Sequence, residues 1–177
     1  MSSPLKNPLA VNSNAFFFEQ DRSDKILVLG VGNYLMGDEG VGVHATEALA
    51  ERGYPDHMEL LDGGTGGFLL LSAFEAYSKI IIIDATIDGQ PAGTINQIEP
   101  KFASDFPSAL SVHDLGLKDM IEAVYLMDQV PRMFLFTVAV EELVPMCIDL
   151  SPKVSAALPR LTEQILTLAE TLQKEAV

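Results

Sequence analysis

The sequence predicts a three-layer α/β/α sandwich with a mostly parallel, twisted sheet of about five strands and one antiparallel edge strand. Three observations carry this prediction. From Lys25 onward, short apolar segments alternate with segments of helical periodicity. Residues 80–83 are four isoleucines without a polar position, as expected for a central strand buried on both faces. The chain has 177 residues, which suits one such domain and is too short for two.

The first half of the domain is predicted to hold three strands and two helices. Residues 26–29 form an apolar strand, and apolar residues at helical spacing predict a helix over residues 41–52, which Gly53 ends. Residues 58–61 form the second strand, and residues 68–77 form the second helix before the isoleucine strand.

The second half adds two strands and two helices. A strand over residues 94–98 follows the isoleucine strand too closely for a helical crossover, so we expect it to be antiparallel and to lie at an edge. Residues 99–112 form a long polar loop, and such loops are often functional. The remaining elements are a helix over residues 115–127, a strand over residues 133–140 and a last helix that starts at Ser151-Pro152.

Composition limits the environment and the partners. Acidic residues outnumber basic ones by 25 to 11, and the net charge of −14 disfavours binding to nucleic acid or anionic membranes. No apolar run approaches the roughly 18 residues of a membrane span, and the N-terminus lacks a secretory pattern, so we expect a cytoplasmic protein. Cys147, the single cysteine, is predicted to be a buried, inert thiol. The acidic surface favours a monomer.

Residues 1–24 are predicted to be a flexible N-terminal extension, because they contain Ser, Asn and Pro without periodicity. Its Phe16-Phe17-Phe18 triplet is expected to dock on the domain. Residues 25–177 form the single α/β domain.

Acidic residues follow each of the first three predicted strands. Asp38-Glu39 follow the first, Asp62 the second and Asp84 the third. Sites in open α/β sheets form beyond the carboxyl ends of the strands, so these acids are predicted to share one edge. Like charges in a partly dry cleft repel one another unless a cation or a proton joins them.

Each acid also has a purely structural interpretation, and the sequence leaves both open. Asp38 is suited to cap the helix that follows it. Asp62 begins a glycine-rich turn and is suited to form an Asx-turn. Asp84 is suited to accept hydrogen bonds from nearby backbone N–H groups.

The three histidines differ in their settings. His44 lies within the first helix, where a surface or packing role is expected, and His57 lies in a polar turn, where solvation is expected. His113 ends the long loop just before a helix and is the candidate for function. Glu39, Asp84 and His113 would together offer carboxylate and imidazole ligands, a set that suits zinc or nickel.

A nucleotide-binding α/β domain is an alternative, because Gly30-Val31-Gly32 follows the first strand. However, Leu35 stands where the third glycine of G-x-G-x-x-G would be, and no basic clamp is nearby. Carboxylates at a helix start also repel phosphate.

The chain resembles the hydrogenase maturation proteases from about residue 26 to the last helix. The resemblance rests on four blocks in order, GVGNYLMGDEGVG, LDGGTGG, IIIDA and SVHDLGL. The family pattern departs at residues 137–142, where a glycine and a proline are often found, and at Asp149, where a glycine often stands. These departures bear on loop shape and substrate choice.

The resemblance implies an endopeptidase that removes the C-terminal extension of the nickel-iron hydrogenase large-subunit precursor after nickel insertion. It implies that Glu39, Asp84 and His113 bind nickel, which the precursor brings as a recognition mark, so no permanent cofactor is expected. Asp38 and Asp62 are assigned to positioning the substrate or acting as a base. A non-enzymatic nickel-binding maturation chaperone is an alternative.

The sequence shows no arrangement of side chains for a protein nucleophile, so peptide hydrolysis would require an activated water. Two routes stay open. In one, the three ligands grip the precursor's metal and Asp38 or Asp62 acts as base. In the other, they hold a catalytic metal whose bound water attacks. The family resemblance favours the first route.

Overall fold

The computed structural model describes residues 22–107 and 115–175. They form a five-stranded sheet with the order β2-β1-β3-β5-β4. Four strands are parallel and β4 is antiparallel to β5, as the sequence predicted. The strands are β1 (Ile26–Val31), β2 (Met58–Gly64), β3 (Lys79–Thr86), β4 (Ile95–Ile98) and β5 (Arg132–Ala139).

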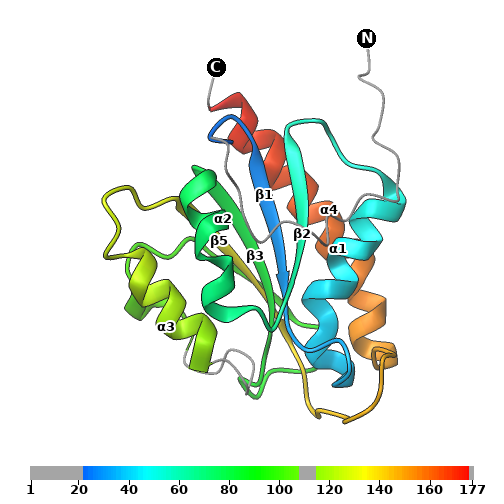
Figure 1. The fold of residues 1–177 in the computed structure, drawn as a ribbon. Helices are drawn as coiled ribbons and strands as arrows, with labels where there is room; N and C mark the ends of the chain where they lie inside the picture. The colour runs from blue at the N-terminus through cyan, green and yellow to red at the C-terminus, as the bar shows by residue number, and fades with distance from the viewer. Residues whose placement is uncertain (1–21, 108–114, 176–177) are drawn as a thin grey trace.

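Helices cover both faces of the sheet, which confirms the three-layer architecture (Figure 1). The helix pair α1 and α4 packs on one face, and α2 and α3 pack on the other. The helices are α1 (Val41–Arg52), α2 (Leu71–Ala76), α3 (Leu115–Val124) and α4 (Pro152–Lys174), with short 3-10 helices η1 (Gly37–Gly40), η2 (Gly67–Leu70) and η3 (Ala103–Asp105).

The central strand β3 serves two hydrophobic cores. Ile81 and Ile83 belong to the core under α1 and α4, whereas Ile80 and Ile82 belong to the core under α2 and α3. All four side chains are fully buried, because successive side chains of a strand point to opposite faces and both faces are covered.

Strand β4 lies at the edge, as predicted, but its neighbour is β5 and not β3. The parallel pairing of β3 with β5 places an almost wholly buried strand in the central position. The partly exposed β4, which carries Asn96 and Gln97, is left at the border.

Two helix boundaries differ from the sequence prediction. The helix expected over residues 68–77 begins as η2 and becomes α-helical only at Leu71, after Gly67 adopts a φ of 49°. The helix expected to reach residue 127 ends at Val124. Leu126 and Met127 donate their N–H groups to carbonyls only three residues back, so the chain tightens into turns there.

The predicted N-terminal extension lies mostly outside the described residues, as does its phenylalanine triplet. The described chain is already anchored at its first residue, because the Arg22 N–H donates to the Ala76 carbonyl at 2.9 Å. Within the described ranges, no helix has both the length and the apolar character needed to span a membrane.

Candidate functional site at the carboxyl edge of the sheet

The start of α1 is pressed against the carboxyl ends of β1 and β3, and a glycine makes this possible. A Cβ atom at Gly42 would lie 2.3 Å from the Val31 carbonyl oxygen and 2.4 Å from that of Ile83. No residue with a side chain fits there without moving the backbone. Gly42 therefore brings the helix and the strands together.

This close approach places Glu39 and Asp84 at the same end of the sheet. Glu39 lies in η1, which packs against β3, and Asp84 follows Ile83 within β3. Gly32 lets η1 approach, because a Cβ atom there would lie 1.9 Å from the Glu39 carbonyl oxygen. Both acids are buried, Glu39 with 1% and Asp84 with 0% of its surface exposed. Two buried carboxylates are thus gathered where the sequence predicted metal ligands.

Asp38 does not cap α1, whose N-cap is Gly40 without a side-chain hydrogen bond. Its Oδ1 instead accepts a 2.6 Å hydrogen bond from the backbone N–H of Ser151, the N-cap residue of α4. The carboxylate is buried, with 6% of the residue exposed. Asp38 therefore ties the β1–α1 segment to the start of the last helix.

Asp62 lies apart from the buried pair. It pairs with Gly30 in the β1–β2 ladder, so it is about two strand spacings, roughly 10 Å, from the β3 position opposite it. Its side chain is exposed, and Oδ1 accepts a 2.9 Å bond from the Gly64 N–H, which confirms the predicted Asx-turn. By strand alternation it shares the α1–α4 side with Leu60, whereas Asp84 shares the α2–α3 side with Ile82.

The third predicted ligand, His113, lies outside the described residues. Helix α3 begins two residues later, at the end of the molecule where β1 and β3 have their carboxyl ends (Figure 1). Among the described residues, no group of three His, Cys, Asp or Glu side chains forms a metal site. The structure thus brings Glu39 and Asp84 to one edge of the sheet, and the predicted metal triad stays a prediction.

One buried polar neighbour of Asp84 was not anticipated from the sequence. Thr137 of β5 is directly opposite Asp84 in the parallel ladder, and only 2% of it is exposed. A single hydroxyl within the apolar run of β5 is the signal that points to it, because it falls at the same end of the sheet as the acids.

His44 has the packing role that was expected of it. Its ring stacks on Tyr34 with centroids 4.7 Å apart, and Nε2 donates to the Ile148 carbonyl at 2.8 Å. His57, expected to be solvated, is half-buried, and burial lowers its pKa. Cys147, expected to be buried, is only half-buried.

The fold and this edge together define a class of protein. It is an α/β domain with a mostly parallel sheet that has helices on both faces. Buried carboxylates lie at the carboxyl edge of this sheet, next to the first helix. A nucleotide-binding domain would instead present backbone N–H groups to phosphate there.

Comparison with known proteins gives the family. The model of the family described as hydrogenase maturation protease matches residues 43–168. The chain is 35% identical over 156 residues to the hydrogenase 2 maturation protease of Escherichia coli strain K12, covering 86% of this chain and 95% of that protein. This chain belongs to the hydrogenase maturation protease family, whose members are peptide hydrolases.

Solved structures agree with this assignment. The hydrogenase maturating endopeptidase HybD from E. coli superposes with a TM-score of 0.74 at 38% identity, over 83% of this chain and 93% of that one. The [NiFe] hydrogenase maturation protease HybD from Thermococcus kodakarensis gives a TM-score of 0.68 at 25% identity, over 82% and 99% of the two chains.

Proposed function

We propose that this protein is the endopeptidase that removes the C-terminal extension from the large-subunit precursor of a nickel-iron hydrogenase after nickel insertion. The nickel arrives with the precursor and is recognised by Glu39, Asp84 and His113, so the enzyme has no permanent cofactor. We expect it to act in the cytoplasm as a monomer that meets the precursor transiently.

The observation that carries this proposal is the burial of Glu39 and Asp84 at one edge of the sheet of a maturation protease. Asp84 Oδ1 accepts the Ala85 N–H at 2.8 Å, as the sequence had suggested. Two neighbouring carboxylates with almost no solvent contact still repel one another, so a nearby cation lowers their energy. A nickel ion on the precursor would supply that positive charge. A histidine at the start of α3 would supply the softer nitrogen ligand that nickel accepts.

Hydrolysis requires a base that activates water, and the two candidate acids differ in their availability. Each accepts one backbone N–H, Asp38 from Ser151 and Asp62 from Gly64. Asp38 is buried, however, whereas Asp62 is exposed. We therefore favour Asp62 as the base and Asp38 as the residue that holds the edge together. The recognised metal would fix the scissile bond beside it, so positioning of the substrate would supply most of the rate acceleration. The rival route, with a metal-bound water as nucleophile, uses the same ligands.

The test is to incubate the purified protein with precursor large subunit, with and without bound nickel, and to measure the product mass. The wild type is expected to shorten only the nickel-loaded precursor. Glu39→Gln and His113→Ala should stay folded and lose conversion at least a hundredfold. Glu51→Gln, on the exposed side of α1, and His57→Ala are the matched controls.

Full processing by both Glu39→Gln and His113→Ala would overturn the assigned ligands. A wild type that binds nickel but leaves the precursor's length unchanged would instead establish the non-enzymatic maturation chaperone. Processing without nickel loading would remove the metal from recognition.

A further inference from the structure

A groove flanked by exposed apolar side chains lies next to the candidate site. It has a volume of about 540 Å³ and runs between the β1–α1 segment and the loop that joins β5 to α4. We call it the edge groove and define it by Gly37, Asp38, Val144, Cys147, Asp149 and Ser151, which line it. Asp38 connects it to the candidate metal site, because Asp38 lines the groove and directly precedes Glu39.

Exposed apolar side chains are concentrated around this groove. The described residues expose eight large apolar side chains, and four of them belong to the two segments that form the groove walls. Met146 is 86% exposed, and Leu35 is 51% exposed. The other two are Val144 and Ile148. Val144 lines the groove, and the other three lie within two residues of a lining residue. Exposed apolar side chains grouped in this way mark interaction sites more often than isolated ones do.

Hydrogen bonds join the two segments that form the walls of the groove. Gly37 N–H donates to the Cys147 carbonyl at 2.7 Å, and Cys147 N–H donates to the Leu35 carbonyl at 3.2 Å. The His44 and Asp38 hydrogen bonds described above add two further ties. The exposed side chains are therefore displayed on a preformed frame, so a partner would bind with little cost in ordering it.

Backbone strain supports a binding role for this loop. Met146 directly precedes the lining residue Cys147, has a φ of 58° and is the one non-glycine residue with positive φ among those described. A left-handed conformation disfavours a long side chain, and such conformations cluster at functional sites. The residue with this disfavoured backbone conformation thus also exposes a large apolar side chain.

The charge of the groove selects the partner. Its walls carry four acids, Asp38, Glu141, Glu142 and Asp149, and one cation, Lys153. Lys153 is already paired with Glu141 at 2.9 Å. The lining of the groove therefore combines apolar residues with a net negative charge, which is complementary to an apolar segment with basic flanks. A second copy of this chain is a poor match, because two net-negative grooves would repel.

We propose that the edge groove is the docking surface for an extended, apolar segment of the precursor polypeptide that is flanked by basic residues. This inference rests on the proposed function and deepens it. The metal site would hold the precursor at one point, and the groove would align the chain beside it. Two contacts on a rigid edge fix the direction in which the scissile segment runs.

The test measures binding and cleavage separately, with the full-length chain and nickel-loaded precursor. Val144→Ser/Met146→Ser is expected to raise the Kd for the precursor at least tenfold. Glu142→Lys/Asp149→Lys should slow association and weaken its dependence on salt. Glu51→Lys/Glu122→Lys makes the same change of charge at exposed helical positions away from the groove. It should leave the Kd and the association rate unchanged.

The outcomes separate the groove from the proposed function. If the wild type cleaves the precursor and both groove variants match it in Kd, the groove proposal is wrong while the function stands. If the wild type binds without cleaving and the groove variants lose binding, the function is wrong while the groove stands. A wild type that does neither overturns both.

Two other occupants would also be revealed. Sedimentation of the wild type as a dimer that Val144→Ser/Met146→Ser dissociates would make the groove a contact between copies and overturn the proposal. Tighter precursor binding by the same variant would show that another part of this chain competes for the groove, and it would overturn the proposal as well.

Discussion

The two ends of the sheet handle charge in opposite ways. At the amino ends of the strands, Glu59 and Glu99 are partly exposed and each is paired with an arginine. At the carboxyl ends, Asp38, Glu39 and Asp84 are gathered together and buried. The first arrangement contributes modestly to the stability of the fold, and the second brings acidic side chains together, where a cation or a proton lowers the energy. The contrast separates an end that is held by ion pairs from the end that carries the candidate site.

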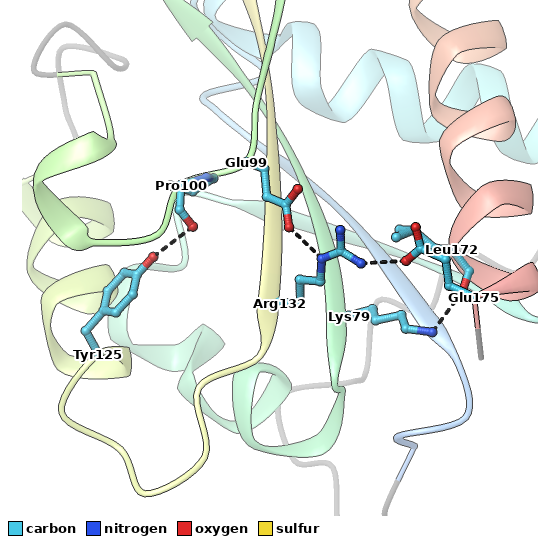
Figure 2. A network of polar contacts seen from close by, with 7 residues as sticks. All are labelled: Lys79, Glu99, Pro100, Tyr125, Arg132, Leu172 and Glu175. Carbon is cyan, nitrogen blue, oxygen red and sulfur yellow. Dashed lines mark hydrogen bonds and ion pairs between the residues drawn. The ribbon is translucent and has the colours of Figure 1, made fainter.

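At the amino end, hydrogen bonds and ion pairs join separate elements, and we call these contacts clasps (Figure 2). Arg132, at the start of β5, bonds Glu99 after β4 at 2.5 Å and Glu175 after α4 at 2.6 Å. Lys79, at the start of β3, donates to the Leu172 carbonyl at 3.0 Å. These bonds join the edge strand and the last helix to the sheet.

A second clasp at the same end joins the first described residue to the sheet. Glu59 of β2 accepts a 2.5 Å hydrogen bond from the Tyr77 hydroxyl and pairs with Arg22. Burial and the neighbouring Glu59 raise the pKa of Tyr77, so the phenol stays protonated and keeps donating. Side-chain pairs thus tie the amino end of the sheet to the segments around it.

The largest expected effect comes from breaking the close approach at the carboxyl end. Gly42→Ala should lower the free energy of unfolding by about 3 kcal/mol or more, because the added Cβ meets two backbone carbonyls. Gly89→Ala is the matched control, since its φ of 78° costs about 1 kcal/mol but the space is open. Urea denaturation measures both, and equal losses would show that the contact at Gly42 is relieved cheaply.

Asp38 tests whether one carboxylate at the carboxyl end is structural. Asp38→Ala leaves the Ser151 N–H without its acceptor and should lower the free energy of unfolding by about 2 kcal/mol. Asp38→Asn keeps an oxygen acceptor and should lose much less. Thermal denaturation of the two variants checks this, and equal stability of Asp38→Ala and the wild type would remove the structural role.

Arg132→Met tests the clasps at the amino end. The guanidinium is about 43% exposed, so its ion pairs are solvent-screened, and we expect a loss of only about 1 kcal/mol. Precursor processing should not change, because the clasp lies at the far end of the strands. Arg160→Met, which removes one long hydrogen bond to Gly93, is the control. Reduced processing by a folded Arg132→Met would contradict the separation of a stabilising amino end from a functional carboxyl end.

The smallest expected effect is the pH dependence of the same clasp. The hydrogen bond from Arg132 lowers the pKa of Glu99 below its usual value. The stabilisation is therefore present above about pH 4.3, the pKa of an unfolded glutamate, and is lost as the pH falls through the lower folded pKa. Glu99→Gln should be less stable than the wild type at pH 7, and the difference should shrink as the pH falls below about 4.3, whereas Glu51→Gln should show no such convergence.

Much of the candidate site could be predicted because the sequence shows where the strands end. The apolar runs before Asp62 and Asp84 locate their carboxyl ends, and parallel strands bring those ends to one edge. The sequence could not say that Asp62 is exposed and Asp84 buried, because that depends on which faces the helices cover. Nor could it pair Asp38 with Ser151, which are 113 residues apart.

The sequence by itself determined the layered fold, the antiparallel β4 and the helix ends marked by Gly53 and Ser151-Pro152, because these follow from local periodicity, connection length and capping chemistry. Only the tertiary structure decided the position of β4 beside β5 and the union of the β1–α1 segment with the β5–α4 loop. Those contacts join residues distant along the chain, and their partners are fixed by close packing and by hydrogen-bond geometry that no local pattern records.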